Sequence, residues 1–268
     1  MTQVASDAIV LHAFDYRETS RILRIVTREH GVRSAIARGA RRSKQRFGAA
    51  LDLFAEGAAQ LALHPTGDLH TLISFDVSRA RPELAARWDR FAAANALSEL
   101  LLRFARDDTH TELYDAFRSA LDAVGRAEGD DVIAAGLGGA WSLVGYLGFA
   151  PVLDACAGCG APIKRDQSAA FSHRAGGAIC AACETAGRLP AQRTVPGDAR
   201  ETISAWVSGQ PIATPGLPDL RAHLRLLREF LVEHLADERP LRAFAVWERD
   251  GAQRSAVSAP GGGGEPFG

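Results

Sequence analysis

The sequence predicts an α+β protein with a small N-terminal β-barrel, followed by a helical domain that contains a four-cysteine module. Three observations lead to this prediction. Five short apolar segments with strand character fill the first 80 residues, with turn residues between them. Apolar residues then recur at helical spacing between residues 81 and 247. The four cysteines of the chain stand as two closely spaced pairs inside that helical part.

Length and charge are those of an ordinary globular chain. The 268 residues carry 31 Lys and Arg against 32 Asp and Glu, so the total charge favours no class of partner. Residues 1–10 have neither the basic start nor the apolar run of a signal peptide. Residues 132–149 are apolar but interrupted by glycines, which fits a buried helix better than a membrane span. We therefore expect a cytoplasmic protein without a membrane partner, whose thiols stay reduced.

The first 80 residues form the predicted barrel. We expect strands over residues 8–14, 20–27, 32–37, 57–63 and 69–77. His30-Gly31 and Pro65-Thr66-Gly67-Asp68 are turn signals between consecutive strands. Five short strands, with no helix between most of them, predict a partly open five-stranded barrel such as an OB-fold. An SH3-like barrel fits the same pattern, which does not separate the two.

Basic residues concentrate between Arg17 and Arg46, where ten Arg and Lys stand against two Glu. The densest part is Arg38-Gly39-Ala40-Arg41-Arg42-Ser43-Lys44-Gln45-Arg46, which joins two predicted strands. On a barrel whose loops bind oligonucleotides, this run predicts phosphate contacts, and a solvated flexible loop is the alternative. The candidate nucleic-acid-binding residues are Arg21, Arg24, Arg33, Arg38, Arg41, Arg42, Lys44 and Arg46.

Aromatic residues are few in this basic region. Phe14, Tyr16 and Phe47 lie near it, and we expect Phe14 and Phe47 in the core. The sequence therefore gives no support for a base-stacking platform. Binding through phosphates alone would be independent of base sequence and would weaken steeply with salt.

The cysteines form the most specific motif of the chain. They read Cys156-Ala-Gly-Cys159 and Cys180-Ala-Ala-Cys183, with twenty residues between the pairs. Two C-x2-C hairpins that face each other present four sulfurs as a tetrahedron, which is the closed shell of structural Zn²⁺. The sequence thus predicts a zinc ribbon in which Cys156, Cys159, Cys180 and Cys183 hold one structural ion.

Three other states of these thiols are the alternatives. Disulfides are disfavoured because nothing indicates secretion, and idle buried thiols would not need this spacing. A redox pair is disfavoured because neither pair lies between a predicted strand and helix of a βαβ unit. Four sulfur ligands leave no position for water, so the ion would be structural rather than catalytic.

Catalytic motifs are missing from the sequence. A zinc deaminase needs a His-x-Glu, but His173 is followed by Arg174 and Ala175. Neither a phosphate-cradling Gly-x-x-x-x-Gly-Lys-Ser/Thr nor a Gly-x-Ser-x-Gly occurs. We therefore expect no enzyme, which disfavours a zinc-dependent hydrolase or deaminase. A zinc-ribbon transcription or protein-interaction adaptor stays open as an alternative.

Helical patterns fill most of the rest of the chain. We expect a helix from Arg81-Pro82 to about residue 105 with Trp88 on its buried stripe. Further helices are expected over about 111–124, 131–147, 198–207 and 219–236, with a last packed segment over 241–247. A groove for a partner peptide between the middle helices is a lesser alternative to a plain core. Arg221, Arg225 and Arg228 make a stripe that we interpret as a solvated face rather than a DNA path.

These patterns divide the chain into three parts. Residues 1–80 are the predicted OB-fold and DNA-binding domain, and residues 81–249 are the helical domain, with the zinc module at about 152–188. Residues 250–268, which are rich in glycine, are a predicted disordered tail.

Several segments together resemble the bacterial RecO family of DNA repair proteins over about residues 4–247. In the N-terminal part they are Ala8-Ile9-Val10-Leu11, Asp15-Tyr16, Glu18-Thr19, Thr27-Arg28-Glu29-His30-Gly31, Arg38-Gly39-Ala40-Arg41-Arg42-Ser43-Lys44, and Arg46-Phe47-Gly48-Ala49-Ala50-Leu51 with Phe54. Further on they are Gly145-Tyr146-Leu147-Gly148-Phe149-Ala150-Pro151 before Cys156-x-x-Cys159-Gly160, Phe230-Leu231, His234-Leu235 and Arg239-Pro240-Leu241-Arg242. Arg17 departs from the family, which usually has a small residue there.

The resemblance implies an OB-fold, a helical domain with a zinc module, and a non-enzymatic recombination mediator. Such proteins bind single- and double-stranded DNA, anneal complementary strands and help to load RecA onto strands coated with single-strand-binding protein (SSB). The implied partners are DNA, RecR and the C-terminal tail of SSB, and the implied location is the cytoplasm, associated with the nucleoid. The residues by themselves support DNA binding and a structural metal.

Overall fold

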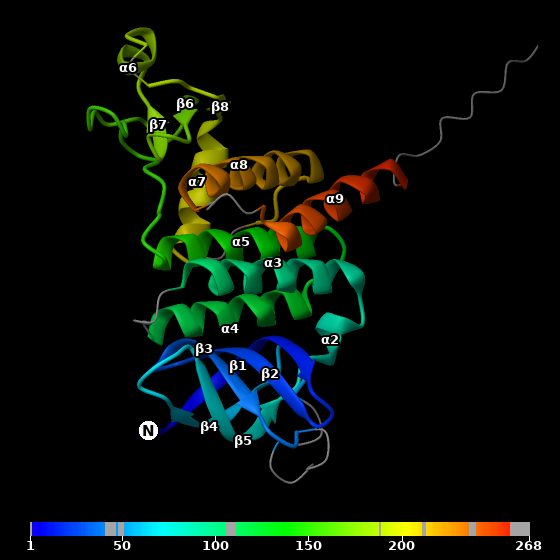
Figure 1. Cartoon of the computed structure of the whole chain (residues 1–268). Helices are drawn as coiled ribbons and strands as arrows, with labels where there is room; N and C mark the ends of the chain where they lie inside the picture. Colours follow the sequence, from blue (N-terminus) through cyan, green and yellow to red (C-terminus); the bar gives the residue numbers. More distant parts are fainter. Residues whose placement is uncertain are drawn as a thin grey trace, which may run out of the picture.

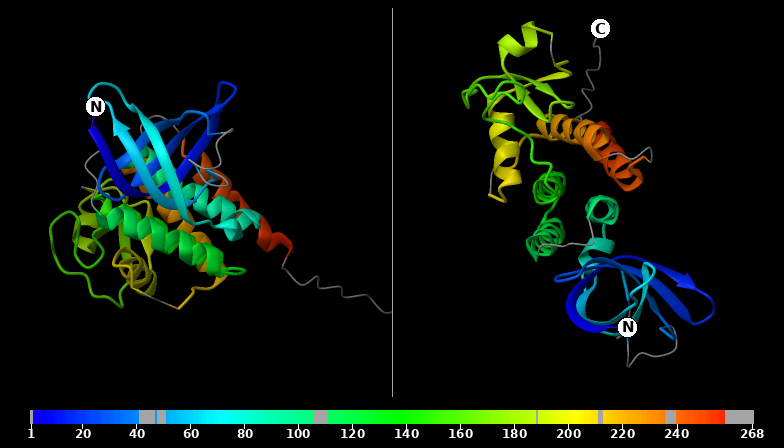
Figure 2. Two further views of the ribbon diagram at one scale, coloured as in Figure 1. Left: turned by 90° about the horizontal axis from the view of Figure 1, so that it is seen from below. Right: turned by 60° about the vertical axis from the view of Figure 1, so that its left-hand side comes forward.

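The computed structural model of the chain describes residues 2–40, 47, 51–105, 111–187, 189–210, 213–235 and 240–257. A β-barrel forms one end of the molecule, and a small module with three short strands forms the other (Figure 1). Helices fill the space between these two ends (Figures 1 and 2). In the part of the chain that is described, no helix is both long and apolar enough to cross a membrane.

Five strands close the barrel in the order β1-β2-β3-β5-β4. They are β1 (Thr2–Tyr16), β2 (Ser20–Thr27), β3 (Gly31–Ala37), β4 (Glu56–Leu63) and β5 (Leu69–Arg79). Neighbouring strands are antiparallel except β3 and β5, which are parallel. This arrangement confirms the predicted OB-fold and decides against the SH3-like alternative.

The first strand is twice as long as its sequence pattern indicated. Residues 2–9 pair with β4, and residues 8–16 pair with β2, so one strand joins two sides of the barrel. A shift of register between Val10 and His12 marks an irregularity in the second of these pairings. The polar positions among residues 2–7 hid the first half of the strand.

The barrel interior is apolar, and one aromatic residue assigned to it lies elsewhere. Leu23, Ile25, Leu61 and Phe75 are buried inside, and Phe47 closes the barrel as expected, with 2 % of its surface exposed. Phe14 is 45 % exposed, so the prediction that it lies in the core is wrong. Alternation along β1 places it on the outer face, beyond the part that the helices cover.

The helical part has a single large core. Its helices are α2 (Pro82–Ala85), α3 (Trp88–Phe104), α4 (Thr111–Arg126), α5 (Asp131–Tyr146), α7 (Gly197–Val207), α8 (Leu217–Leu235) and α9 (Arg242–Val257). The helices α3, α4 and α5 lie between the barrel and the later helices (Figures 1 and 2). Trp141, Phe117, Phe230 and Trp247 are fully buried in this core.

Two details of the helices differ from the sequence pattern. The expected helix from residue 81 is divided at residues 86–87, so Trp88 begins α3 and is 57 % exposed instead of lying in the core. The last helix continues to Val257, beyond residue 250, where the sequence pattern placed the start of a disordered tail.

Arg81 connects the barrel to the helices. Its side chain is completely buried, with Nη2 2.6 Å from Glu56 Oε2 and Nε 3.0 Å from Asp122 Oδ1. Nη1 donates to the carbonyl oxygen of Phe54 over 2.9 Å. Tyr114 donates to Glu56 Oε1, and burial, reinforced by this carboxylate, raises the pKa of Tyr114. The arginine thus joins residues of the barrel to α4 through charge-assisted hydrogen bonds.

The small module at the other end contains a sheet of order β7-β6-β8. Its elements are β6 (Ala169–Ser172), β7 (Gly177–Ile179), α6 (Ala181–Thr185) and β8 (Arg193–Val195). Arg200 of α7 donates to the carbonyl oxygens of Leu153, of Lys164 over 2.5 Å and of Gln167 over 2.7 Å. These bonds hold the irregular segment of the module on α7.

A carboxylate on α8 holds the sheet of the module. Glu229 accepts hydrogen bonds from Arg193, with Nε at 2.6 Å, and lies 3.1 Å from His173 Nε2. The hydrogen bonds from Arg193 lower the pKa of Glu229, whereas burial lowers the pKa of His173. The module therefore has polar attachments to both α7 and α8.

Candidate metal centre and nucleic-acid interface

The four cysteines meet at one point, as predicted. Their sulfur atoms all lie within 4.8 Å of one another, and Sγ of Cys159 is 3.7 Å from Sγ of Cys180. A tetrahedron with metal–sulfur bonds of about 2.3 Å has edges of about 3.8 Å, so this spacing suits a metal. A disulfide needs about 2.0 Å, and all four cysteines are free.

The two pairs are positioned by different local structures. Cys156 and Cys159 lie in a tight turn, in which the amide of Gly160 donates to the carbonyl of Cys156 and Gly160 has a φ of +75°. A left-handed conformation of this kind favours glycine. The second pair is not on a hairpin, because Cys180 is the residue before α6 and Cys183 lies inside that helix.

This position bears on the argument against a redox pair. Cys180 directly follows strand β7, and Cys183 lies within helix α6. However, β7 belongs to an antiparallel hairpin with β6 and not to a βαβ unit. The two sulfurs of the first pair complete the cluster, which favours a four-ligand metal site over a redox pair.

Backbone amides shape the chemistry of these thiols. Burial raises the pKa of Cys156, but hydrogen bonds from the amides of Cys180, Cys159 and Gly158 outweigh this effect. The net result is a pKa lowered to about 6. The amide nitrogen of Cys180 lies 3.3 Å from Sγ of Cys156. Hydrogen bonds with the other sulfurs, that of Cys159 first, raise the pKa of Cys183 to about 12. The cluster can thus form a thiolate near neutral pH, and metal binding would release its remaining protons.

The turn between the first pair leaves no space beside the sulfurs. A Cβ added to Gly158 would lie 2.6 Å from Leu189 Cδ1 and 3.5 Å from Sγ of Cys183. Leu189 therefore packs beside the sulfur cluster on this side, and a larger residue at position 158 would require its side chain to shift. The donor set and its spacing fit a metal ion with four protein ligands and no open position.

The basic candidates of the barrel do not all lie together. Arg21 and Arg38 lie at the same end of the β2–β3 pair, because Arg21 is opposite Ala37. Arg21 donates to Asp15 Oδ1 over 3.1 Å and to the carbonyl of Leu51, whereas Arg38 is exposed. These two arginines lie at the base of the basic segment. Its remaining candidates, Arg41, Arg42, Lys44 and Arg46, lie outside the described residues.

Arg24 and Arg33 occupy other parts of the same strands. Arg33 is opposite Ile25, four residues along β2 from Arg21, and donates to the carbonyl of Val32. Arg24 projects from the outer face, and its buried Nε has no hydrogen-bond partner among the described residues. The structure thus brings two of the four described candidates to one end and separates the other two.

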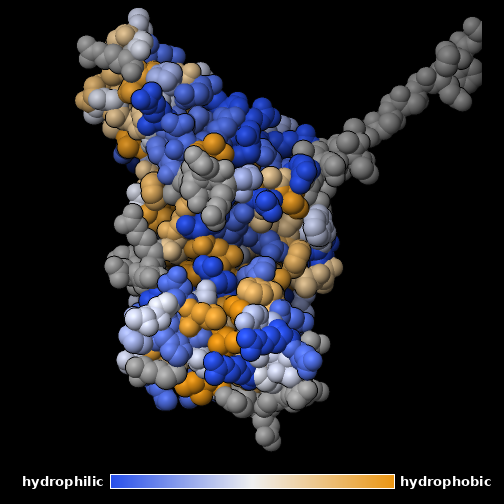
Figure 3. All heavy atoms as spheres, in the orientation of Figure 1, coloured by the Kyte–Doolittle hydropathy of each residue, from blue (hydrophilic) through white to orange (hydrophobic). Residues whose placement is uncertain are grey.

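Two arginines outside the set of candidate DNA-binding residues form ion pairs with carboxylates. Arg28 forms a 2.9 Å ion pair with Asp115 of α4, and Arg228 of α8 lies 3.0 Å from Glu248. The α8 stripe therefore includes a paired arginine. The face of the molecule that Figure 3 shows carries both apolar and hydrophilic patches over the barrel and the adjoining helices.

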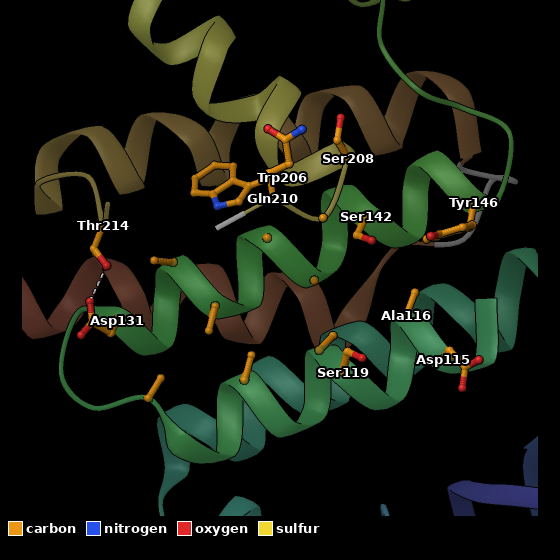
Figure 4. A pocket seen from close by; sticks show the side chains of 18 of the residues that line it. Asp115, Ala116, Ser119, Asp131, Ser142, Tyr146, Trp206, Ser208, Gln210 and Thr214 are labelled. Atoms are coloured by element: carbon orange, nitrogen blue, oxygen red, sulfur yellow. Dashed lines mark hydrogen bonds between the residues drawn. The ribbon is translucent and has the colours of Figure 1, made fainter. Parts of the chain in front are cut away.

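A groove lies between α4, α5 and α7, where the sequence allowed one. It has a volume of about 720 Å³ and is lined by small residues such as Ala120 and Gly139. Trp206 of α7 lies at its side (Figure 4). Asp115 and Asp131 line it, and Thr214 donates to Asp131 over 2.6 Å. Its carboxylates make this groove unsuitable for a nucleic-acid backbone.

Two family models match the chain over most of its length. Residues 1–81 match "Recombination protein O N terminal", and residues 85–243 match "Recombination protein O C terminal". The boundary between them coincides with Arg81 and α2.

Curated relatives give the same result. A DNA repair protein RecO of Anaeromyxobacter sp. (strain K) is 35 % identical over 258 residues, which cover 91 % of this chain and 96 % of the relative. That of Myxococcus xanthus (strain DK1622) is 33 % identical over 241 residues, with 88 % and 93 % covered. That of Desulfitobacterium hafniense (strain Y51) is 33 % identical over 205 residues, with 76 % and 69 % covered. On this evidence the chain belongs to the RecO family of DNA repair proteins.

Proposed function

We propose that this RecO-family chain is a recombination mediator without catalytic activity. It binds single- and double-stranded DNA, anneals complementary strands and helps to load RecA during recombinational repair. The observation that carries the proposal is the OB-fold barrel with Arg21 and Arg38 at the base of its most basic segment. Membership of a family of DNA repair proteins supports it.

The proposed mechanism of annealing is charge neutralisation. Two DNA strands repel each other through their phosphates, and cations bound to both strands lower this repulsion. The proposed phosphate-binding residues are Arg21, Arg24, Arg33, Arg38, Arg41, Arg42, Lys44 and Arg46. Contacts of this kind position DNA without reading its sequence. A mediator that acts on any damaged site requires such sequence independence.

One structural Zn²⁺ is the proposed ion of the cysteine cluster. Thiolate ligands, four in number and spaced for a tetrahedron, suit zinc and leave it without a water ligand. Bound there, the ion connects the turn at Cys156 and Cys159 to the start of α6. The proposed role is therefore to maintain the fold of the module, and no chemical step is assigned to the metal.

Partners and location follow from the family. We include RecR and the C-terminal tail of SSB among the proposed partners, with the cytoplasm and the nucleoid as the place of action. The proposed division assigns residues 1–80 to DNA binding and residues 81–249, with the zinc module at about 152–188, to the helical domain. The arginine at the boundary, Arg81, joins these two parts.

Replacement of the four basic loop residues tests DNA binding. The change is Arg41, Arg42, Lys44 and Arg46 to Ala, and fluorescence polarisation measures affinity for single- and double-stranded oligonucleotides of two unrelated sequences at several salt concentrations. Each lost phosphate contact makes the negative slope of log affinity against log salt less steep by about 0.7 for single strands. We therefore expect the magnitude of the slope to fall by about 3. Both sequences should be affected equally.

A charge-matched variant is the control. Lys164, Arg165, Arg174 and Arg225 are exposed basic residues of the module and α8, and their joint replacement by Ala removes the same charge. This control should keep the wild-type slope. An unchanged slope in the loop variant would refute the assignment, and strict sequence preference or no DNA binding by the wild type would favour the adaptor alternative.

A further inference from the structure

Two rows of side chains cross the outer face of the barrel. Residues directly opposite one another on neighbouring strands point to the same face of a sheet. The first row consists of His12, Arg24, Ser34 and Leu69 on β1, β2, β3 and β5. The second row consists of Phe14, Ile22, Ile36 and Thr71 on the same strands. Leu23 and Ala35, which alternate with them, point into the core, so both rows lie outside.

These rows line an exposed hollow. It has a volume of about 430 Å³, and Leu102 of α3 and Asp68 of the β4–β5 turn complete its wall. Phe14 is 45 % exposed and Leu69 is 43 % exposed. The His12 and Phe14 rings are 5.9 Å apart, with their planes inclined by 53°. Aromatic and apolar faces are therefore available to a ligand in a hollow that α3 borders but does not fill.

Cationic groups accompany these apolar faces. Arg24 lies between His12 and Ser34 in the first row, and it forms no ion pair among the described residues. At the end of β1, the guanidinium of Arg17 lies 5.2 Å from the centre of the Tyr16 ring. Among the described residues, the one negative charge that lines the hollow is Asp68. It lies on the β5 side, so Ser34 of β3 separates it from Arg24 of β2. An anion would thus approach at the β1–β2 side of the hollow.

We propose that this hollow is a stacking subsite for an unpaired nucleotide, whose base packs on Phe14 while its phosphate meets Arg24. An aromatic face beside a cation matches the two parts of a nucleotide, and stacking accepts any base. A purely apolar peptide would leave the guanidinium of Arg24 without a partner in the site. The inference rests on the proposed DNA binding and adds a preference for single strands, because bases inside a duplex are already stacked.

Replacement of Phe14 by Ala tests the subsite. We measure binding of the full chain to a labelled single-stranded oligonucleotide and to the duplex of the same sequence. The Kd for the single strand should rise roughly five- to hundredfold, as for the loss of one stacked base, and the Kd for the duplex should change less than twofold. The salt slope should stay unchanged, because Phe14 carries no charge. Phe14→Trp should retain tight binding.

Phe149→Ala is the matched control. Phe149 is also exposed, at 36 %, but lies between α5 and the cysteine module, so its loss should leave both Kd values unchanged. Equal binding of the single strand by wild type and Phe14→Ala would overturn the subsite. An equal loss for duplex and single strand would overturn it as well, because a general weakening does not report stacking.

An abasic oligonucleotide gives a test that needs no variant. It keeps every phosphate but lacks bases, so the wild type should bind it as weakly as Phe14→Ala binds the normal strand, and Phe14→Ala should lose nothing further. Equally tight binding of the abasic and normal strands by the wild type would refute stacking while DNA binding still stands. No binding to either strand would instead refute the proposed function.

Discussion

The barrel and the cysteine module organise their functional residues in opposite ways. In the module, four sulfurs separated by up to 27 positions in sequence meet within 4.8 Å. In the barrel, the described basic candidates are spread over one end, the outer face and the middle of two strands. A metal ion needs a closed shell of fixed ligands, whereas a strand of phosphates needs cations along a path.

This difference predicts how each region responds to substitution. Removal of one proposed metal ligand would open the shell and affect the whole module, whereas one proposed DNA-binding arginine would contribute one phosphate contact among several. The arginines also differ among themselves, because some are buried between carboxylates and others face solvent. The following predictions test these contrasts, beginning with the largest expected effect.

Cys156→Ala should have the largest effect. The module contains only a small apolar cluster, with Cys156, Ala170 and Ile179 as its buried members in the described part of the chain. Structural zinc contributes on the order of 10 kcal/mol to the folding of small metal modules, more than so small a core. We expect loss of bound zinc and early unfolding of the module, measured by metal analysis and hydrogen exchange.

Ala182→Ser is the control for this prediction, since residue 182 lies between the second pair of cysteines and is exposed. It should retain zinc and a wild-type melting temperature. If Cys156→Ala also retained both, the cysteine cluster would not be a structural metal site.

Arg81→Ala should be the most damaging arginine substitution. It leaves the carboxylates of Glu56 and Asp122 without their shared buried cation, and such a loss costs about 3–5 kcal/mol. Arg225→Ala, at an exposed position on α8, should change the free energy of unfolding by no more than about 0.5 kcal/mol. Chemical denaturation measures both values. Similar changes in the free energy of unfolding for the two variants would show that the burial of Arg81 adds nothing to stability.

The helices beneath the module should respond to acid through His223. Burial against Trp206 lowers the pKa of His223 to about 4, although Asp219 and Asp198 raise it. An unfolded histidine has a pKa of about 6.5, so between pH 4 and 6.5 the unfolded state binds the additional proton. The contribution is thus fully present above pH 6.5 and is lost as the pH falls toward 4.

Denaturation at pH 7 and pH 5 measures this effect. The wild type should lose about 2 kcal/mol more than His223→Asn over this interval. His30→Gln, which changes a histidine in a turn of the barrel, should behave as the wild type does. An equal loss in the wild type and in His223→Asn would exclude His223 as the source.

Trp88→Ala should have the smallest effect. The side chain is 57 % exposed, so its loss should cost less than about 1 kcal/mol. Trp141→Ala, a substitution at a fully buried position, should cost about 3–5 kcal/mol. Thermal unfolding of the two variants compares them. If Trp88→Ala lost as much unfolding free energy as Trp141→Ala, Trp88 would have to be buried in the core.

Local patterns predicted most of the elements and the convergence of the four cysteines. The cysteine spacing requires only two turns near each other, and the turn at residues 65–68 is specified by its own residues. Phe14 and Trp88 were placed wrongly, because periodicity shows which residues share a face but not which face another element covers. The stacking subsite was missed for the same reason.

Long-range polar contacts had no sequence signal. Arg81 meets Asp122, 41 positions away, and Glu229 meets Arg193, 36 positions away. The local sequence around an arginine is the same whether its side chain is buried in such a network or is exposed for DNA binding. The close packing of Leu189 at Gly158 likewise has no signal in the sequence, because it depends on the folded module.

Photo-crosslinking of the wild-type chain to a single-stranded oligonucleotide that contains 5-iodouracil tests the central claim most directly. Peptide mapping of the products identifies which end of the molecule touches DNA. We predict crosslinks within residues 8–51, with Phe14 and the basic segment among them, and none within residues 152–188. Crosslinks confined to the cysteine module or to α8 would contradict this assignment of DNA binding to the barrel.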